Sequence, residues 1–424
     1  MNAKELKRLL RDGALSAYKH LYTDVERQTK RFVQAIDSFS LLFGEDRDIS
    51  VFSVPGRSEI SGNHTDHNGG CVLAGSIDKD IIAVAAKNDD GVIRFHSEGY
   101  PVDSVKISET DNPDNFKNYT SSALIGGMVR AFINAGKEVG GYDAYSTSDV
   151  LKGSGLSSSA AYEVMIGNIL NHFYNSGAVD NTDIAVFAQY AENVYFGKPC
   201  GLMDQIACAV GGFVYIDFEN AEMPVIEPIS FSLHEAGYTL CIVNTRGNHA
   251  DLNEDYAAVP REMKAVAKLL GRDVLRGLTE RDIVKNFSNI RRVVGDRAVL
   301  RTFHFLRENE RVKKIKEALK SKDLKTFLEA VSESGRSSFE YLQNVYSPSN
   351  EREQGLSIGL ALSEGYLTGK DAVCRVHGGG FAGTIQVFLR NEDAEGYIEY
   401  MNSILGDGSC EAFNVRSVGA AKLF

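Results

Sequence analysis

The stretch LKGSGLSSSAA, residues 151–161, constrains the fold of this chain more than any other segment. Its glycines allow positive φ angles and a close approach of the backbone to a neighbour. The residues before it, YDAYSTSD (142–149), have the composition of a β-strand, and AYEVMIGNILNHFY after it has helical periodicity. The order predicts a strand, a tight glycine-containing turn and a helix over about 157–175.

A helix that begins directly after such a turn presents backbone N–H groups and the positive end of its dipole, which favours an anion. Serine hydroxyls add donors for phosphate oxygens, and one hydroxyl can ligate Mg²⁺. The stretch therefore predicts a phosphate cradle. The alternative is that small residues only permit close helix packing, with Ser157 as a helix cap. The stretch is not a Walker A loop, because no Gly-Lys-Ser/Thr follows at the required spacing.

The length of 424 residues exceeds what one hydrophobic core usually supports, so we expect two domains. The most loop-like segment near the middle is NAEMPVIEPIS (220–230), which predicts domains over 1–220 and 221–424. Helical spacing over 4–43 predicts two helices, and residues 1–37 are interpreted as a helical extension. Other patterns predict strands, at 49–54, 71–77, 80–87, 92–97, 211–218, 238–245, 372–377 and 384–389, and helices, at 121–136 and 182–196.

Charge and cysteine content narrow the function classes. The net charge of −11 argues against a nucleic-acid partner, which would normally need a basic surface. No apolar run reaches the ~18 residues of a membrane span, and the N-terminus lacks the apolar core of a signal peptide. Six scattered cysteines without a CxxC pair are typical of reduced thiols, so we expect a cytoplasmic protein.

Two further polar or glycine-rich segments accompany the serine stretch. VPGRSEISGNHTDHNGG (54–70) places Arg57, His64, Asp66 and Asn68 in a predicted turn-rich region, where they can hydrogen-bond the hydroxyls of a polar ligand. His64 and His67 have no third metal ligand in view, so we expect no metal site there. RVHGGGFAGTIQVFL (375–389) is either a tight connection or backbone moulded around a ligand.

Together these motifs resemble the GHMP kinase superfamily, and within it the galactokinases. PGRSEISGNHTDHNGG resembles the family's first signature, KGSGLSSSA its second and GGGFAG its third. KPCGLMDQIACAVG (198–211) resembles the segment that carries the family's catalytic aspartate, and NYTSSALIGG (118–127) its nucleotide-side helix. The resemblance implies an α+β fold of two domains, the first like ribosomal protein S5 and the second ferredoxin-like. It covers the chain from about residue 38 onward.

The resemblance also implies a reaction, in which the γ-phosphate of ATP passes to the anomeric hydroxyl of galactose. It assigns Asp204 as the group that takes the hydroxyl's proton, with Arg57 beside it. It assigns Mg²⁺ to Glu192 and to Ser159, with Ser158 as the second choice. The nucleotide phosphates are assigned to one continuous run, Gly153, Ser154, Gly155, Leu156, Ser157, Ser158 and Ser159.

For the sugar, the resemblance implies a pocket made by Asn63, His64, Asp66 and Tyr256, with Asp204 completing it. Asp66 is suited to bind two neighbouring hydroxyls with one carboxylate. Tyr256 lies in NEDYAAVPREM, which resembles a helix of the family, although a tyrosine at such spacing is more often part of a core.

Several residues depart from the family's signatures: Asn63, His67, Leu151, His377 and Ala382. Asn63 replaces a glutamate that the family uses on the sugar's 6-position. An amide still bonds a 6-hydroxyl, and it removes a charge that would repel a 6-carboxylate. Galactose is the predicted substrate, with a related sugar such as galacturonate as the alternative. A non-catalytic galactose- and ATP-binding sensor is the other alternative. The sequence predicts partners that are small molecules, with neither nucleic acid nor membrane.

Overall fold

The computed structural model describes residues 1–22, 24–150, 155–247 and 252–424. The chain divides into two compact units, each made of separate segments. Unit 1 comprises Met1–Arg57, Ser76–Gly212 and Arg416–Phe424, and unit 2 comprises Ser58–Gly75 and Phe213–Val415. Two domains were expected from length, and the boundary predicted near residue 220 stays a prediction.

Unit 1 is built on a mixed sheet in the order β12-β1-β2-β5-β3-β4. Its strands are β1 (Ser50–Ser61), β2 (Cys71–Lys87), β3 (Val92–Ser97), β4 (Val102–Lys106), β5 (Tyr142–Ser148) and β12 (Ala421–Lys422). The last part of β1, from Ser58, and the first part of β2, up to Gly75, belong to unit 2. Its helices are α1 (Ala3–Arg11), α2 (Val25–Phe43), α3 (Ser121–Asn134), α4 (Ser158–Tyr174), α5 (Asn181–Tyr190) and α6 (Met203–Val210). A π-helical turn, Ala191–Phe196, continues α5.

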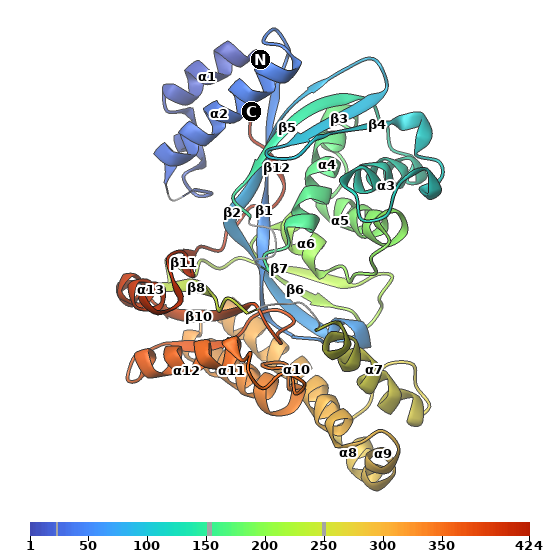
Figure 1. Ribbon diagram of the computed structural model, residues 1–424, viewed down its shortest axis with the longest axis vertical. Coiled ribbons are helices and arrows are strands. Elements are labelled where there is room, and N and C mark those ends of the chain that lie inside the picture. The colour runs from blue at the N-terminus through green and yellow to red at the C-terminus, as the bar shows by residue number, and fades with distance from the viewer. Residues whose placement is uncertain (23, 151–154, 248–251) are drawn as a thin grey trace. The chain divides into compact units, whose positions relative to one another are not determined.

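Helices cover both faces of this sheet. In Figure 1, α1 and α2 lie against one face and α3, α4 and α5 against the other. Alternate residues of β2, Ile82, Val84 and Ala86, are buried in one apolar cluster with Phe32 and Phe39 of α2. Side chains alternate between the two faces of a strand, so the 82–84–86 set faces the N-terminal helices. The helical extension is therefore part of the core of unit 1.

Unit 2 contains a four-stranded antiparallel sheet in the order β11-β8-β10-β9. Its strands are β8 (Tyr238–Asn244), β9 (Val373–Val376), β10 (Thr384–Arg390) and β11 (Cys410–Phe413). Also in this unit, β6 (Phe213–Asp217) pairs with β7 (Val225–Ile229) and with the Cys71–Gly75 part of β2. Its helices are α7 (Asn253–Leu269), α8 (Glu280–Lys285), α9 (Phe287–Val293), α10 (Asp296–Ser321), α11 (Leu324–Ser337), α12 (Gly355–Leu367) and α13 (Asn391–Leu405). The order of β8 to β11, with helices before β9 and before β11, is that of a ferredoxin-like unit. This confirms the expected α+β fold.

Some predicted elements differ from the observed ones. The loop predicted at 220–230 is wrong, because Val225–Ile229 forms β7 and pairs with β6. The two strands predicted at 71–77 and 80–87 are one strand, β2. The strand continues through Asp78 and Lys79, and the next residue, Asp80, is fully buried and paired with arginines. The region predicted to be turn-rich from residue 54 begins as strand, since β1 continues to Ser61.

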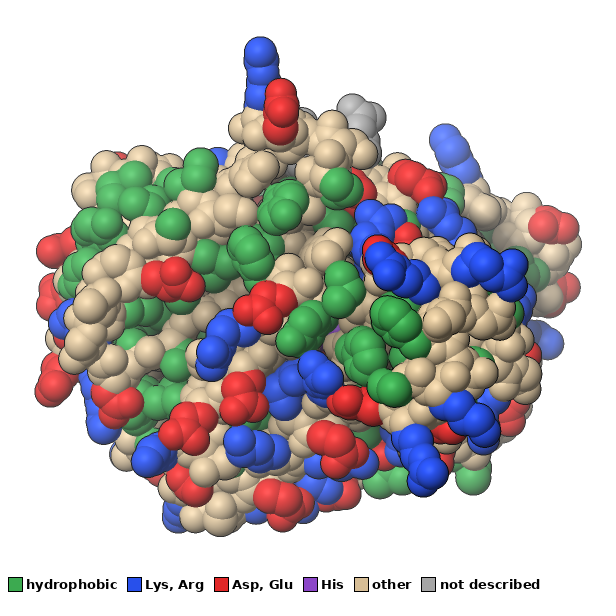
Figure 2. All heavy atoms as spheres, turned by 90° about the horizontal axis from the view of Figure 1, so that it is seen from below, with side chains coloured by type: hydrophobic (Ala, Val, Ile, Leu, Met, Phe, Trp, Pro, Cys, Tyr) green, Lys and Arg blue, Asp and Glu red, His purple; other side chains and the backbone are tan. Residues whose placement is uncertain are grey.

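One face of the molecule is mixed in charge. Figure 2 shows acidic and basic side chains interspersed over the face that it presents.

Among the described residues, no helix is both long and apolar enough to cross a membrane. All six cysteines lie in the described part of the chain as free thiols.

Candidate active site

An arginine–aspartate pair in unit 1 forms the centre of the candidate site. Arg57 lies in β1, and Asp204 lies in the first turn of α6. The guanidinium donates from Nε to Oδ1 over 2.7 Å and from Nη2 to Oδ2 over 2.9 Å. Two parallel charge-assisted bonds fix the orientation of the carboxylate as well as its position. The pairing inferred from the resemblance is therefore present in the geometry.

This pair is partly shielded from water. The Arg57 side chain is 10% exposed and that of Asp204 is 34% exposed. Burial alone would raise the pKa of Asp204. The charge and hydrogen bonds of Arg57, with a hydrogen bond from Ser157, outweigh burial and hold the pKa below its usual value. The carboxylate is thus ionised at neutral pH and able to accept a proton or a hydrogen bond.

The serine-rich stretch meets the same pair. Arg57 donates from Nη1 to the carbonyl of Gly155 over 2.5 Å, and its backbone N–H donates to the carbonyl of Leu156 over 3.1 Å. A β-carbon on Gly56 would lie 2.8 Å from that Leu156 oxygen, so only glycine permits this approach. Of the predicted phosphate-binding residues, Gly153 and Ser154 lie outside the described residues.

Ser157 does not have the capping role considered from sequence. It precedes α4 with a φ of 59°, in the left-handed region, and its side chain makes no capping bond. The hydroxyl donates instead to Oδ2 of Asp204. The helix-cap interpretation of Ser157 is therefore wrong. Ser158 and Ser159 form the first turn of α4, where the dipole of a 17-residue helix favours a negative charge.

Sequence reasoning missed part of a buried carboxylate cluster beside Asp204. Glu192, which was predicted, is 2% exposed and accepts from Lys198 and from Gln205, each over 2.9 Å. Gln205 also donates to Glu163 over 3.3 Å, and Glu163 is fully buried. Burial and the neighbouring Glu192 raise the pKa of Glu163 well above its usual value. Glu163 follows Ser159 by four residues on α4, so helical spacing places both on one face.

The donor set of this cluster fits a magnesium ion. Oε1 of Glu163 and Oε1 of Gln205 are buried and have no hydrogen-bond partner. Mg²⁺ prefers oxygen ligands and is usually held by one or two carboxylates together with substrate phosphates and water. Glu192 and Glu163 would supply two carboxylates to such an ion, and Ser159, on the same helix as Glu163, would supply a hydroxyl. No group of three or more His, Cys, Asp or Glu residues in the described part of the chain is arranged to hold a metal by itself.

In unit 2, the predicted sugar-binding residues gather on a glycine turn. Asn63 donates from Nδ2 to the carbonyl of Gly378 over 2.5 Å, and His64 bonds through Nε2 to that of Gly379 over 2.8 Å. Tyr256 donates from its hydroxyl to the carbonyl of Gly380 over 2.7 Å. The first and third sequence motifs therefore meet within this unit.

The turn requires glycine at its third position. Gly380 has a φ of 79°, and a β-carbon there would lie 2.0 Å from the backbone oxygen of Asn344. Asn344 also donates to Gly379 over 3.1 Å.

Oδ1 of Asn63 is buried and has no hydrogen-bond partner, so this amide retains one acceptor. Asp66 lies half-buried in a short turn, Asp66–Asn68, and its charge acts on His64.

Asn68 is structural, contrary to the sequence interpretation. It is fully buried and donates to the sulfur of Met263 over 3.5 Å, while its Oδ1 accepts from the backbone of Leu275 over 3.2 Å. The rings of His64 and His67 lie 5.9 Å apart between centroids. Burial lowers the pKa of His67 to about 3, so this imidazole is neutral at physiological pH.

Comparison with known proteins identifies the family of this chain. Residues 123–212 match the N-terminal domain of GHMP kinases, and residues 37–87 match the galactokinase galactose-binding signature. A galactokinase of Streptomyces coelicolor is 32% identical over 359 residues, which cover 83% of this chain and 87% of the relative. A galactokinase of Clostridium tetani is 28% identical over 352 residues, covering 81% and 85%.

Solved structures share the fold. The Lactococcus lactis galactokinase complexed with galactose superimposes with a TM-score of 0.75 at 21% identity, covering 91% of this chain and 98% of that one. A mevalonate kinase superimposes with a TM-score of 0.58 at 15% identity, covering 87% and 99%. Sequence identity across most of the length and a shared two-domain fold point the same way, and the chain belongs to the galactokinase family of GHMP kinases.

Proposed function

We propose that this protein is an ATP-dependent galactokinase. It transfers the γ-phosphoryl group of ATP to the anomeric hydroxyl of galactose, giving galactose 1-phosphate and ADP. The observation that carries the proposal is the bidentate Arg57–Asp204 pair beside the carbonyls of Gly155 and Leu156. The galactokinase relatives and the galactose-complexed structure support the choice of sugar.

The chemistry follows from the charges. Asp204 accepts the proton of the C1 hydroxyl as that oxygen forms a bond to the γ-phosphorus. The bond between the γ-phosphorus and the β–γ bridging oxygen breaks, and ADP leaves with the electron pair. Arg57 keeps Asp204 ionised before the reaction and stabilises negative charge on the transferred group. Ser157 holds the orientation of Asp204 through its hydroxyl.

The nucleotide is assigned to the start of α4. Backbone N–H groups of the 153–159 run cradle the phosphates, and the helix dipole adds to the attraction. Mg²⁺, when bound, neutralises phosphate charge, and Ser159 and Glu192 would hold it, with Glu163 and Gln205 next to Glu192. For the sugar, Asn63, His64, Asp66 and Tyr256 remain the proposed binding residues.

A 6-carboxylated sugar such as galacturonate is the second candidate, on one observation. Position 63 has no carboxylate, and the nearby positive charge of Arg301 acts on His64. Arg301 is 1% exposed and is paired over 2.9 Å with Glu262, which also binds Arg297. Arg301 thus places a positive charge near His64 that would suit an anionic sugar, while the charge of Asp66 acts on His64 in the opposite sense.

The deciding experiment measures sugar-dependent ADP release with galactose, galacturonate and glucose at saturating Mg·ATP. We expect turnover with galactose. Turnover with galacturonate alone would show that galacturonate, and not galactose, is the substrate. It would still support the proposed phosphoryl transfer. Tight galactose binding without ADP release from any sugar would contradict the kinase proposal and favour a sensor.

A further inference from the structure

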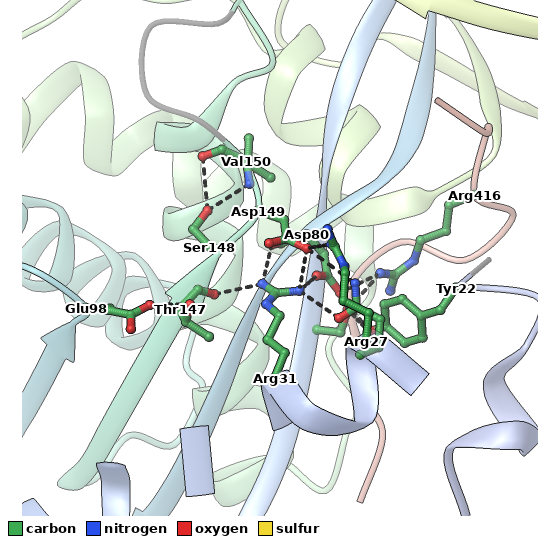
Figure 3. Close-up of polar contacts among 12 residues, drawn as sticks. Tyr22, Arg27, Arg31, Asp80, Glu98, Thr147, Ser148, Asp149, Val150 and Arg416 are labelled. Atoms are coloured by element: carbon green, nitrogen blue, oxygen red, sulfur yellow. Dashed lines mark hydrogen bonds and ion pairs between the residues drawn. The ribbon is translucent and has the colours of Figure 1, made fainter. Parts of the chain in front are cut away.

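Helix α2, the second helix of the chain, reaches the end of β5 through an ion network that the proposed reaction does not use. Arg31 contacts the carboxylates of Asp80 over 2.6 Å and of Asp149 over 3.3 Å. It also donates to the backbone carbonyls of Asp80, over 2.8 Å, and Thr147, over 3.1 Å. Figure 3 shows the Arg31 guanidinium directed at the end of β5, with Arg27 beside it.

The network is anchored in the core of unit 1. Asp80 is fully buried and also accepts from Arg416 over 3.2 Å and from the hydroxyl of Tyr22 over 2.7 Å. Burial would raise the pKa of Asp80, but the charges of Arg31 and Arg416 outweigh it and hold the pKa below its usual value. Such a buried carboxylate keeps its position only while its partners are in place.

Asp149 is held from several sides. Arg27 pairs with its carboxylate, and Gln28 donates to it over 3.3 Å. Its own backbone N–H donates to the carbonyl of Asp80 over 2.9 Å. Arg27 and Gln28, which make two of these contacts, lie in the first turn of α2. Arg31 follows one turn later on the same helix. Helix α2 therefore fixes Asp149, the residue that directly follows β5.

The contacts continue from Asp149 to the candidate site. The next residue, Val150, is held by the Ser148 hydroxyl, which bonds to its N–H and to its carbonyl, each over 3.0 Å. A β-carbon on Gly56 would lie 3.1 Å from the Val150 side chain and 2.8 Å from the Leu156 carbonyl. Val150 and Leu156, on either side of residues 151–155, thus both abut Gly56, the neighbour of Arg57.

We propose that Arg31 is a positioning residue for nucleotide binding. By holding Asp80 and Asp149 it fixes Val150 against Gly56, and Gly56 also meets the Leu156 carbonyl that the backbone N–H of Arg57 binds. The helical extension is then part of the kinase machinery. This inference rests on the proposed function, since it requires Mg·ATP as the ligand.

The chain offers a matched control at the other end of the same strand. Arg47 follows α2 and donates to the carboxylate of Asp143 over 2.9 Å and to the carbonyl of Lys87 over 2.7 Å. Asp143 is the second residue of β5, whereas Asp149 follows its last residue. Both arginines fasten the N-terminal region to β5, but only Arg31 does so next to the serine-rich stretch.

The test compares Arg31→Met and Arg47→Met in the full-length protein. Calorimetry gives the Kd for a non-hydrolysable Mg·ATP analogue, and steady-state kinetics give kcat and the two KM values. We expect Arg31→Met to raise the Kd and the ATP KM about three- to thirty-fold, with kcat and sugar KM within about twofold. Arg47→Met should leave the analogue Kd within about twofold, although both variants lower the Tm. Arg31→Lys should recover part of the affinity.

A double-mutant cycle completes the test. Asp149→Asn combined with Arg31→Met should weaken nucleotide binding by less than the product of the single effects, because both act through one contact. If Arg31→Met does not fold, Arg27→Met replaces it in the cycle, since Arg27 is half-exposed. Equal analogue affinity in the Arg31 and Arg47 variants, or multiplicative effects in the cycle, would overturn the inference. Failure of the unaltered protein to bind the analogue would instead overturn the proposed function and the inference with it.

Discussion

The region around Asp204 in unit 1 and the region around Asn63 in unit 2 hold their polar side chains by opposite means. In the first, an ion pair and a buried carboxylate cluster carry the geometry. In the second, neutral side chains donate to three consecutive glycine carbonyls. Fixed charges suit the stabilisation of a charged transition state, whereas neutral bonds suit recognition of hydroxyl groups. We call the region around Asp204 the charged region and the region around Asn63 the neutral region. Asn63 and His67, which depart from the family signature, lie in the neutral region.

The largest expected effect is that of Asp204→Asn. The amide keeps the shape of the side chain but cannot accept the hydroxyl's proton, so kcat should fall by at least about 10²-fold. Calorimetry should find sugar and nucleotide binding retained. Asp143→Asn, a buried aspartate paired with arginines elsewhere in unit 1, is the control and should keep its kcat. An unchanged kcat in Asp204→Asn would show that Asp204 is not the group that accepts the hydroxyl's proton.

Arg57→Met should reduce kcat by about 10²-fold, because it removes a fixed positive charge from the site of transfer. It should also change the pH profile. Arg57 holds the pKa of Asp204 down against burial, so without it the carboxylate protonates at a higher pH. The acid limb of kcat/KM therefore moves to higher pH. A profile that keeps its acid limb in place would show that another group titrates there.

The neutral region should lose stability in acid through His304. This buried imidazole bonds to the backbone oxygen of Asn63 over 3.0 Å, and burial lowers its pKa to about 4 against the opposite effect of Glu308. The unfolded chain takes up the proton near pH 6.5, so stability is complete above that pH and is lost as the pH falls toward 4. Between pH 7 and 5 the loss should reach about 2 kcal/mol.

Denaturant unfolding at a series of pH values measures this loss. His304→Gln should flatten the dependence in that window, even if it lowers stability throughout. A slope that is the same in the variant and in the unaltered protein would assign the acid sensitivity to other histidines.

The smallest effect expected is that of Tyr256→Phe. It removes one neutral hydrogen bond to Gly380, which is worth about 1 kcal/mol, and so the sugar KM should rise about three- to tenfold at nearly constant kcat. Tyr366→Phe on α12 serves as a control in the same unit. A fall in kcat as large as that of Arg57→Met would contradict the division between a charged and a neutral region.

The sequence predicted the site residues that lie in recognisable motifs better than those whose role depends on which residues pack beside them in the fold. Arg57 and Asp204 follow from the family resemblance of their motifs, and the structure pairs them. The strand and the helix predicted on either side of the serine-rich stretch are present as β5 and α4. Glu163 was missed because a glutamate on an apolar helix carries no signal of its function until its neighbour, Gln205, is placed beside it. Helical spacing from Ser159 was the one clue available.

Local patterns also failed where tertiary contacts overrode them. The break predicted within β2 ignored the arginines that neutralise Asp80, which come from α2 and from residue 416. Asn68 reads as a surface turn residue, but its amide is enclosed by Met263 and Leu275. In each case the partners lie far away along the chain, where periodicity and turn composition carry no information.

The C-terminal strand β12 has a consequence for synthesis on the ribosome. It pairs with β1, and Arg416 reaches Asp80, yet residues 416–424 are made only after all of unit 2. Unit 1 therefore cannot complete its fold until unit 2 has been translated. Until then the edge of β1 lacks its partner strand, and the buried carboxylate of Asp80 lacks the charge of Arg416. Nascent chains stalled before residue 416 should therefore be the species that chaperones and proteases recognise.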